Sequence, residues 1–279
     1  MRLNTMSKDL ISLCLNVAVS NRDVNEVCSD LSRFLLWFKD QAEVDMVEMI
    51  TSMRNHSHNT SLIAKNVAGW LIWSEEEVDS FSDAYLQNVI LKGIFFEETP
   101  DGFVLNPCGR SLFGLAAYLH DIAKPKWNKI YELDRRLTQE EMIEQQAHTT
   151  LSSQIIENRG SIFIDQINGL SVIDFNPLVR FLSDCALEHH ERLDGSGYPR
   201  GLKASEISFA GKFFAVIDVL EALMAFRPYK AGIPLERTIR MLEAQAAAGQ
   251  LESKYTSLIA QSLGDPNRKK VLIGFTPGV

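Results

Sequence analysis

The chain has 279 residues and a mass of 31.4 kDa, which allows one large domain or a domain with a small appendage. Its net charge of −8 argues against a long nucleic acid as partner, because such a partner needs a basic face. The four cysteines are scattered without a C-x-x-C pair, which indicates reduced thiols in a cytoplasmic protein. The most apolar N-terminal run, residues 11–19, is too short to span a bilayer, so no membrane partner is expected.

Three amphipathic stretches precede the first histidine. Apolar residues recur at three- and four-residue steps within 10–17, 24–38 and 44–53, a spacing typical of α-helices. We predict an N-terminal helical extension over 1–45, a main domain over 46–250, and a C-terminal helix and tail over 251–279. The extension could form a homodimer contact or a sensory module, or it could simply add helices to the core.

The rest of the chain is also helical in pattern, with one exception. Helices are expected at 56–73, 80–91, 111–123, 138–156, 177–190, 205–226 and 234–248, with a loop over about 159–176. Thr138 and Glu141 have the spacing of a capping box at the start of one of them. Between 94 and 105, two short apolar runs flank Pro100, Asp101 and Gly102, which predicts a β-hairpin. The expected fold class is therefore all-α, a helical bundle with a small β-hairpin insertion near 94–105.

Six histidines are the main candidates for chemistry. Taken singly, each would be best explained as an ordinary core or surface residue, and only their combination with neighbouring residues favours a metal centre. Imidazole together with carboxylate suits iron, manganese, zinc or nickel better than magnesium or calcium. The histidines are His56, His58, His120, His148, His189 and His190.

A first motif lies at the end of an apolar helix. His120 and Asp121 place an imidazole and a carboxylate side by side, able to bind one metal ion or to bridge two. Lys124, one helical turn later, would reach the same cavity as a cation for a phosphate oxygen. A lone His-Asp pair is a weak signal, so this motif depends on the others.

A second motif joins adjacent histidines to a glycine-rich turn. His189 and His190 end a predicted helix, and the following turn contains Gly195 and Gly197 before Pro199 fixes its exit. The glycines would let the backbone approach a ligand closely. The alternative is a surface histidine pair in an ordinary loop at the end of a helix.

A third motif is an acid in an apolar helix. Asp218 should be buried, and a buried carboxylate is costly unless it is paired or bound to a metal ion. An ion pair with Arg227 or Lys230 is the alternative. The first two motifs make the metal interpretation the better one.

Together these motifs resemble the HD-GYP family, a branch of the HD phosphohydrolase superfamily that cleaves cyclic dinucleotides, usually cyclic di-GMP. The resemblance covers about residues 56–242. H-D-I-A-K at 120–124 resembles the family's HD-x-G-K, and L-T-Q-E-E followed by His148 resembles the helix with its middle histidine. H-H-E-R-L-D-G-S-G-Y-P at 189–199 is nearly identical to the naming signature, and 217–230 resembles its closing D-x-x-x-A-L and R-P-Y-[RK]. The chain departs from the pattern at Ala123, where glycine is usual, and in longer segments before His120 and before His189.

The resemblance implies two sets of site residues, metal ligands and substrate contacts. It also implies that Asp121 bridges the metal ions and that Asp121 and Lys124 act in catalysis. The implied metal ligands are His56, His120, Asp121, His148, His189, His190 and Asp218. The implied substrate contacts are Lys124, Gly195, Gly197, Tyr198, Arg227 and Lys230.

The first metal ligand could be His56 or His58. On a continuous helix His56 shares a face with Ile63 and Val67 and so points into the core, which favours it. Ser52 occupies the position one turn earlier, where family members that bind a third metal have glutamate. This favours two metal ions over three.

The expected function is that of a metal-dependent phosphodiesterase in second-messenger signalling. By resemblance it would use metal-activated hydroxide to attack phosphorus in a cyclic dinucleotide, either cyclic di-GMP or cyclic GMP-AMP. Two divalent ions are expected, iron or manganese, with nickel, cobalt or zinc as alternatives. The rival functions are a phosphohydrolase acting on mononucleotides, a di-iron oxygenase, and an inactive protein that only binds the cyclic dinucleotide.

Overall fold

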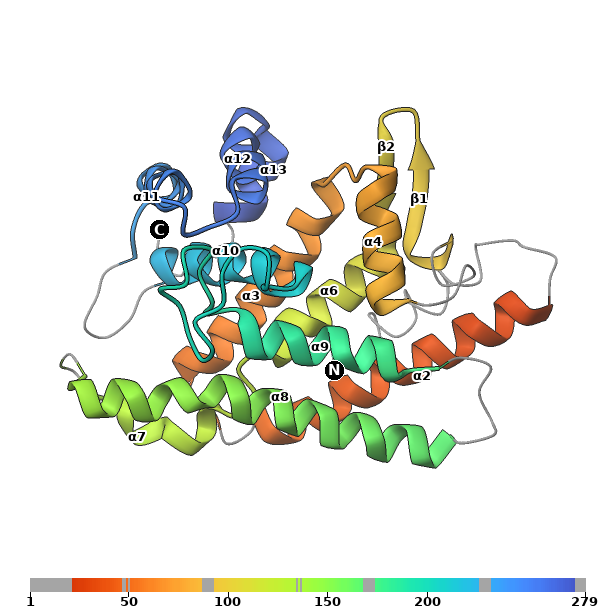
Figure 1. Cartoon of the computed structure of the whole chain (residues 1–279), viewed down its shortest axis with the longest axis horizontal. Helices are drawn as coiled ribbons and strands as arrows, with labels where there is room; N and C mark the ends of the chain where they lie inside the picture. Colours follow the sequence, from red (N-terminus) through yellow and green to blue (C-terminus); the bar gives the residue numbers. More distant parts are fainter. Residues whose placement is uncertain are drawn as a thin grey trace.

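A computed structural model of the chain describes residues 22–46, 49, 51–86, 93–133, 135, 137–167, 174–225 and 232–273. Helices make up most of this part, together with one two-stranded antiparallel sheet (Figure 1). The prediction of an all-α fold with a β-hairpin near 94–105 is therefore confirmed. The predicted helix at 10–17 and the predicted contacts Arg227 and Lys230 lie outside the described residues.

The elements follow one another along the chain with turns and loops between them. They are α2 (Arg22–Met46), α3 (Thr51–Trp70), α4 (Glu75–Tyr85), β1 (Phe96–Thr99), β2 (Gly102–Leu105), α6 (Pro107–Leu119), η1 (Lys124–Trp127), α7 (Asn128–Tyr131), α8 (Gln139–Ile167), α9 (Asn176–Glu188), α10 (Phe209–Met224), α11 (Leu235–Ala247), α12 (Ser253–Gln261), η2 (Ser262–Gly264) and α13 (Pro266–Ile273).

The capping box predicted before α8 is present. The backbone N–H of Thr138 donates to the Glu141 carboxylate at 2.8 Å, and the N–H of Glu141 donates to the Thr138 hydroxyl at 3.2 Å. The predicted end of this helix near 156 is wrong, since α8 continues to Ile167. Gly160 lets α8 pass close to Val179 of α9, and the buried Phe163 extends the apolar stripe into the last turns.

Helix α6 begins earlier and ends earlier than predicted. The side chain of Asn106 accepts hydrogen bonds from the N–H groups of Cys108 and Gly109, and Pro107 fills the first helical position. The helix therefore starts at Pro107 instead of residue 111. It ends at Leu119, and His120 is its C-cap.

Four helices surround the centre of the molecule. Helices α3 and α6 pack along each other, α9 packs against α6, α10 packs against α3 and α9, and α8 covers the other side of α9 (Figure 1). The hairpin pairs Phe96 with Leu105 and continues to Trp73, which exchanges two backbone hydrogen bonds with Phe103 at 2.8 and 2.9 Å. The hairpin therefore extends the apolar core beside α4.

Helix α2 contributes to this same core. Phe34 and Phe38 are fully buried, and the ring of Phe34 stacks on Phe175 at 4.9 Å and meets Phe163 edge-on at 5.4 Å. The described part of the N-terminal extension thus adds a core helix. The domain boundary at residue 45 and the homodimer contact remain predictions. Among the described helices, none combines the length and the apolar character that crossing a membrane requires.

Candidate metal centre

The seven predicted metal ligands come together at the middle of the bundle. Two of them, His120 and His189, are the C-caps of α6 and α9, and each is followed directly by another ligand. Six of the seven are buried, and His190 is partly exposed. The seven are His56 from α3, His120 and Asp121 after α6, His148 from α8, His189 and His190 after α9, and Asp218 from α10.

The ligands form two groups with metal-binding geometry. In each group, one potential ligand atom per residue lies within 4.8 Å of the others. We name them the mixed group, which contains His56, His120 and Asp121, and the three-histidine group, which contains His148, His189 and His190. Two such groups could hold two metal ions, and the number of ions remains a prediction.

Asp121 lies between the two groups. Its Oδ2 is 3.1 Å from Nε2 of His120 and 3.3 Å from Nε2 of His56. Its Oδ1 is 3.3 Å from Nε2 of His148 and 3.6 Å from Nε2 of His189. One oxygen thus faces each group, which is the arrangement that a bridging carboxylate needs.

Asp218 also reaches both groups. Its Oδ1 is 3.2 Å from Nε2 of His56 and 3.8 Å from Nε2 of His120, while its Oδ2 is 3.7 Å from Nδ1 of His190. Within the described part of the chain Asp218 forms no ion pair with a lysine or arginine, and Arg227 and Lys230 lie outside that part.

Helix backbone orients three of the histidine rings. A backbone carbonyl can only accept, so the ring Nδ1 must carry the proton, and Nε2 is left with a free lone pair. The carbonyl belongs in each case to the residue three positions earlier. The pairs are His120 with Ala117 at 2.6 Å, His148 with Gln145 at 2.7 Å, and His189 with Ala186 at 2.9 Å.

The fourth ring, His56, is held by a carboxylate that the sequence analysis missed. Nδ1 of His56 is in contact with Oε2 of Glu221, and Nδ2 of Asn59 donates to the other oxygen of Glu221 at 3.2 Å. Glu221 is 2% exposed and lies one turn after Asp218 on α10. A second acid three residues after the first, in an apolar helix, was the signal that could have revealed it.

The electrostatics of Asp121 and of three of the histidines favour metal ligation. Burial alone would raise the pKa of Asp121, but His120 and Lys124 hold it well below its ordinary value, so the carboxylate is ionised. Burial lowers the pKa of His189 and His190 well below the ordinary value, with the neighbouring imidazoles adding to the effect. Burial also lowers the pKa of His148. These rings are neutral, which is the form that binds metal ions.

Several ligand atoms lack the partners that buried polar atoms normally have. Oδ1 of Asp121, Nε2 of His148 and Nε2 of His189 are buried without a hydrogen bond within the described part of the chain. Leaving such an atom unsatisfied costs about 1–3 kcal/mol. All three atoms point into the space between the ligands, and a metal ion would satisfy them together. The residues therefore fit the predicted metal ions.

Lys124 lies beside the cluster in η1. It is 8% exposed and its ammonium group forms an ion pair with Oδ2 of Asp121. The preceding turn is held by the N–H of Ala123, which donates to the Ser152 hydroxyl at 3.1 Å. Alanine in place of the family's glycine therefore leaves Lys124 next to the ligands.

The glycine-rich turn brings Tyr198 to the edge of the cluster. The ring of Tyr198 is 4.7 Å from that of His190 and 6.4 Å from that of His148, measured between centroids. Gly195 has φ +82°, and a Cβ on Gly197 would lie 2.4 Å from the backbone nitrogen of Arg192. Both glycines are thus required by the shape of the turn, and their contact with substrate remains a prediction.

Two buried acids that the sequence analysis did not single out hold this turn. Glu191 accepts the N–H groups of Arg200 and Leu202 at 2.8 and 2.9 Å. Glu188 accepts the N–H of Ser208 at 2.7 Å and pairs with the Arg200 guanidinium. They bind the segment that follows the histidine pair back onto the end of α9.

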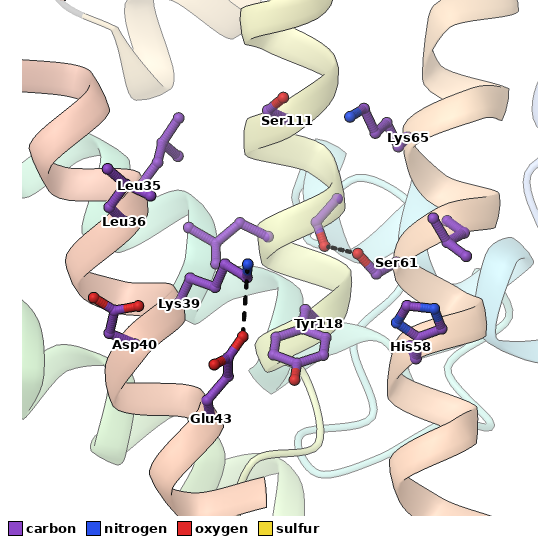
Figure 2. Close-up of a pocket in the computed structure, with 13 residues that line it drawn as sticks. Leu35, Leu36, Lys39, Asp40, Glu43, His58, Ser61, Lys65, Ser111 and Tyr118 are labelled. Atoms are coloured by element: carbon purple, nitrogen blue, oxygen red, sulfur yellow. Dashed lines mark hydrogen bonds and ion pairs between the residues drawn. The ribbon is translucent and has the colours of Figure 1, made fainter. Parts of the chain in front are cut away.

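His58, the alternative first ligand, lies elsewhere. Two residues on an α-helix are about 200° apart, so His58 faces away from His56. It is exposed and lines a cavity of about 440 Å³ between α2, α3 and α6 (Figure 2). Lys39 and Tyr118 are among the other residues that line this cavity. The structure places only His56 in the cluster.

Comparison with known proteins identifies the class. The family described as HD domain matches residues 105–254, more than half of the chain. The chain belongs to this family.

The names of its relatives are those expected for the HD-GYP branch of this family. A cyclic di-GMP phosphodiesterase of Thermotoga maritima is 38% identical over 141 residues, which cover 50% of this chain and 33% of the relative. A 3'3'-cGAMP-specific phosphodiesterase of Vibrio cholerae is 34% identical over 129 residues, which cover 46% of this chain and 24% of the relative. The predicted membership of the HD-GYP family is confirmed, and the matched region spans a third or less of these relatives.

A solved structure of an HDG"Y"P protein from Bdellovibrio bacteriovorus is also similar. It has 14% sequence identity and a TM-score of 0.46, over 93% of this chain and 70% of that chain. This likeness is too distant to support a statement about function.

Proposed function

We propose that the chain is a metal-dependent phosphodiesterase that hydrolyses a cyclic dinucleotide, with cyclic di-GMP the first candidate and 3'3'-cyclic GMP-AMP the second. The observation that carries the proposal is the convergence of seven ligands, six of them in two groups and Asp218 reaching both, with buried ligand atoms that lack hydrogen bonds. The named activities of the relatives, which include both substrates, support it.

We further propose two divalent ions, iron or manganese, with nickel, cobalt or zinc as alternatives. When bound, two such ions would supply a nucleophile from water at neutral pH and would offset charge on the phosphoryl oxygens. The mixture of imidazole and carboxylate donors fits these metals. The scattered cysteines support a cytoplasmic location, and a homodimer contact through residues 1–45 stays a prediction for size-exclusion chromatography.

The side chains around the ligands have distinct proposed roles. Lys124 is already beside Asp121 and would place its ammonium group against a phosphoryl oxygen. Tyr198, at the rim beside His190, would fix the position of the substrate. Arg227 and Lys230 are proposed to bind phosphate on the strength of the family resemblance.

The test is chromatography of the products formed from cyclic di-GMP, 3'3'-cyclic GMP-AMP and cyclic di-AMP by protein loaded with manganese or ferrous iron. We expect a linear dinucleotide or mononucleotides from one of the first two. His56→Ala should lose this activity and bound metal. The matched control His58→Ala removes an exposed histidine of the same helix and should retain both.

The rival functions predict different results. Metal binding without any product from the three substrates would contradict the proposal and favour mononucleotide substrates. Oxygen consumption with a small organic substrate would indicate a di-iron oxygenase. Tight binding of a cyclic dinucleotide without turnover would indicate an inactive binding protein.

A further inference from the structure

The two ligand groups differ in the acceptors that hold their histidines from behind, that is, the groups in contact with the ring Nδ1 on the far side from Nε2. In the three-histidine group, His148 and His189 donate Nδ1–H to backbone carbonyls, and so does His120 in the mixed group. His56 alone among these four has an ionisable side chain, Glu221, at Nδ1. A neutral acceptor and a carboxylate have different effects on the opposite ring nitrogen.

A carboxylate behind an imidazole strengthens the ring as a metal ligand. It fixes the tautomer that carries the proton at Nδ1, orients the ring, and raises the basicity of Nε2. For Glu221 this effect acts in a buried environment, where little water screens the charge. Asn59 holds the second carboxylate oxygen, so the carboxylate is fixed at both oxygens.

The other charged residues of the centre do not distinguish the two groups in the same way. Asp121 presents one oxygen to each group, and Asp218 also reaches both. Lys124 forms its ion pair with Oδ2 of Asp121, the oxygen that faces the mixed group, so its positive charge opposes a metal ion there. The remaining ring, His190, has Oδ2 of Asp218 3.7 Å from its Nδ1, beyond hydrogen-bond distance. Among the described residues, Glu221 is therefore the carboxylate that holds a ligand ring from behind in the mixed group without a counterpart in the three-histidine group.

We propose that Glu221 is a positioning residue that makes the two metal positions unequal: acting through His56, it makes the mixed group the tighter position, which fills first. This inference rests on the metal centre of the proposed function. It adds an order of metal loading and assigns that order to one carboxylate that is not itself among the ligands.

The experiment is titration of the metal-free full chain with Co²⁺, followed by visible absorption and calorimetry. Wild-type protein should bind two equivalents in two resolved steps. Glu221→Gln keeps the size of the side chain and removes its charge. It should weaken the first step by about 10- to 100-fold and leave the second step unchanged.

Two further variants separate positioning from folding. Glu221→Asp keeps the charge but withdraws it from Nδ1, so the first step should weaken less than in Glu221→Gln. Asp184→Asn removes a largely buried carboxylate of α9 that pairs with Tyr85, outside the cluster, and should leave both steps unchanged. Circular dichroism checks that each variant retains the wild-type helical content.

The possible failures are distinguishable. Two equivalents bound by the wild type in a single step, or a Glu221→Gln titration identical to the wild type, would overturn the inference and leave the metal centre intact. Equal weakening of both steps in Glu221→Gln would overturn it as well. A wild-type chain that binds no Co²⁺ would overturn the proposed function itself.

Discussion

Replacing Gly197 by alanine should disturb the glycine-rich turn beside the metal centre. A Cβ at this position would lie 2.4 Å from the backbone nitrogen of Arg192, 2.5 Å from Cα of Glu191 and 2.5 Å from the carbonyl oxygen of His190. Ordinary contacts begin at 3.4 Å, so the turn must open by about 1 Å. All three neighbours are main-chain atoms, which cannot rotate away as a flexible side chain would.

The size of the effect follows from this displacement. Overpacking of this kind costs about 1–3 kcal/mol, and each kcal/mol lowers the unfolding midpoint by about 2–4 °C in a protein of roughly this size. Tyr198 follows directly, and its N–H donates to the carbonyl of His190 at 3.1 Å, so the ring would move with the turn. A misplacement of about 1 Å can reduce the rate about 100-fold.

The assay combines thermal unfolding with kcat/KM on the cyclic dinucleotide proposed as substrate. Gly264→Ala is the matched control, because no atom lies within 4 Å of a Cβ built there. It should match the wild type in both measurements. If Gly197→Ala unfolds at the wild-type temperature and keeps the wild-type rate, the steric reasoning for this turn is refuted.

Three further predictions concern the metal ligands, their neighbour and a buried acid of α9. Asp121→Ala should abolish turnover and lose metal by elemental analysis, whereas Lys124→Ala should keep the metal and lower kcat. Stripping the metal with a chelator should lower the unfolding temperature, since it leaves buried ligand atoms unsatisfied, and adding Mn²⁺ should restore it. Burial raises the pKa of Asp184 from 3.8 to about 6, so its ionised form destabilises the fold and stability falls as pH rises through that range. Urea unfolding of Asp184→Asn should show a gain of at most about 3 kcal/mol near neutral pH that disappears below about pH 4.

The sequence was sufficient to predict the fold class and to single out the histidines and aspartates that the fold brings together. Helical periodicity predicted most of the helices, and the Pro-Asp-Gly turn predicted the hairpin that pairs Phe96 with Leu105. Helix ends were predicted less well. The extension of α8 to Ile167 depends on a close packing of Gly160 against Val179, and such a contact between two helices leaves no periodic pattern in either one.

The division of the ligands into two groups could not be derived from the motifs. Asp121 and His120 are adjacent in sequence, but the two oxygens of Asp121 face different groups. Which histidines meet each oxygen depends on how α3, α8 and α9 pack around α6. That packing joins residues far apart in the chain, so only the folded structure gives it.

The four supported histidines were all predicted from the sequence, but their supporting groups lie at very different distances along the chain. His120, His148 and His189 are oriented by carbonyls three residues earlier, so each ligand and its support lie within one helical turn and form a compact motif. His56 is supported by Glu221, 165 residues away, and no local pattern connects them. A local search therefore finds the ligands that their own helix orients and overlooks the carboxylate that supports His56. If the metal titration shows unequal positions, the difference between them will have been set by a contact that joins residues 165 positions apart in the chain.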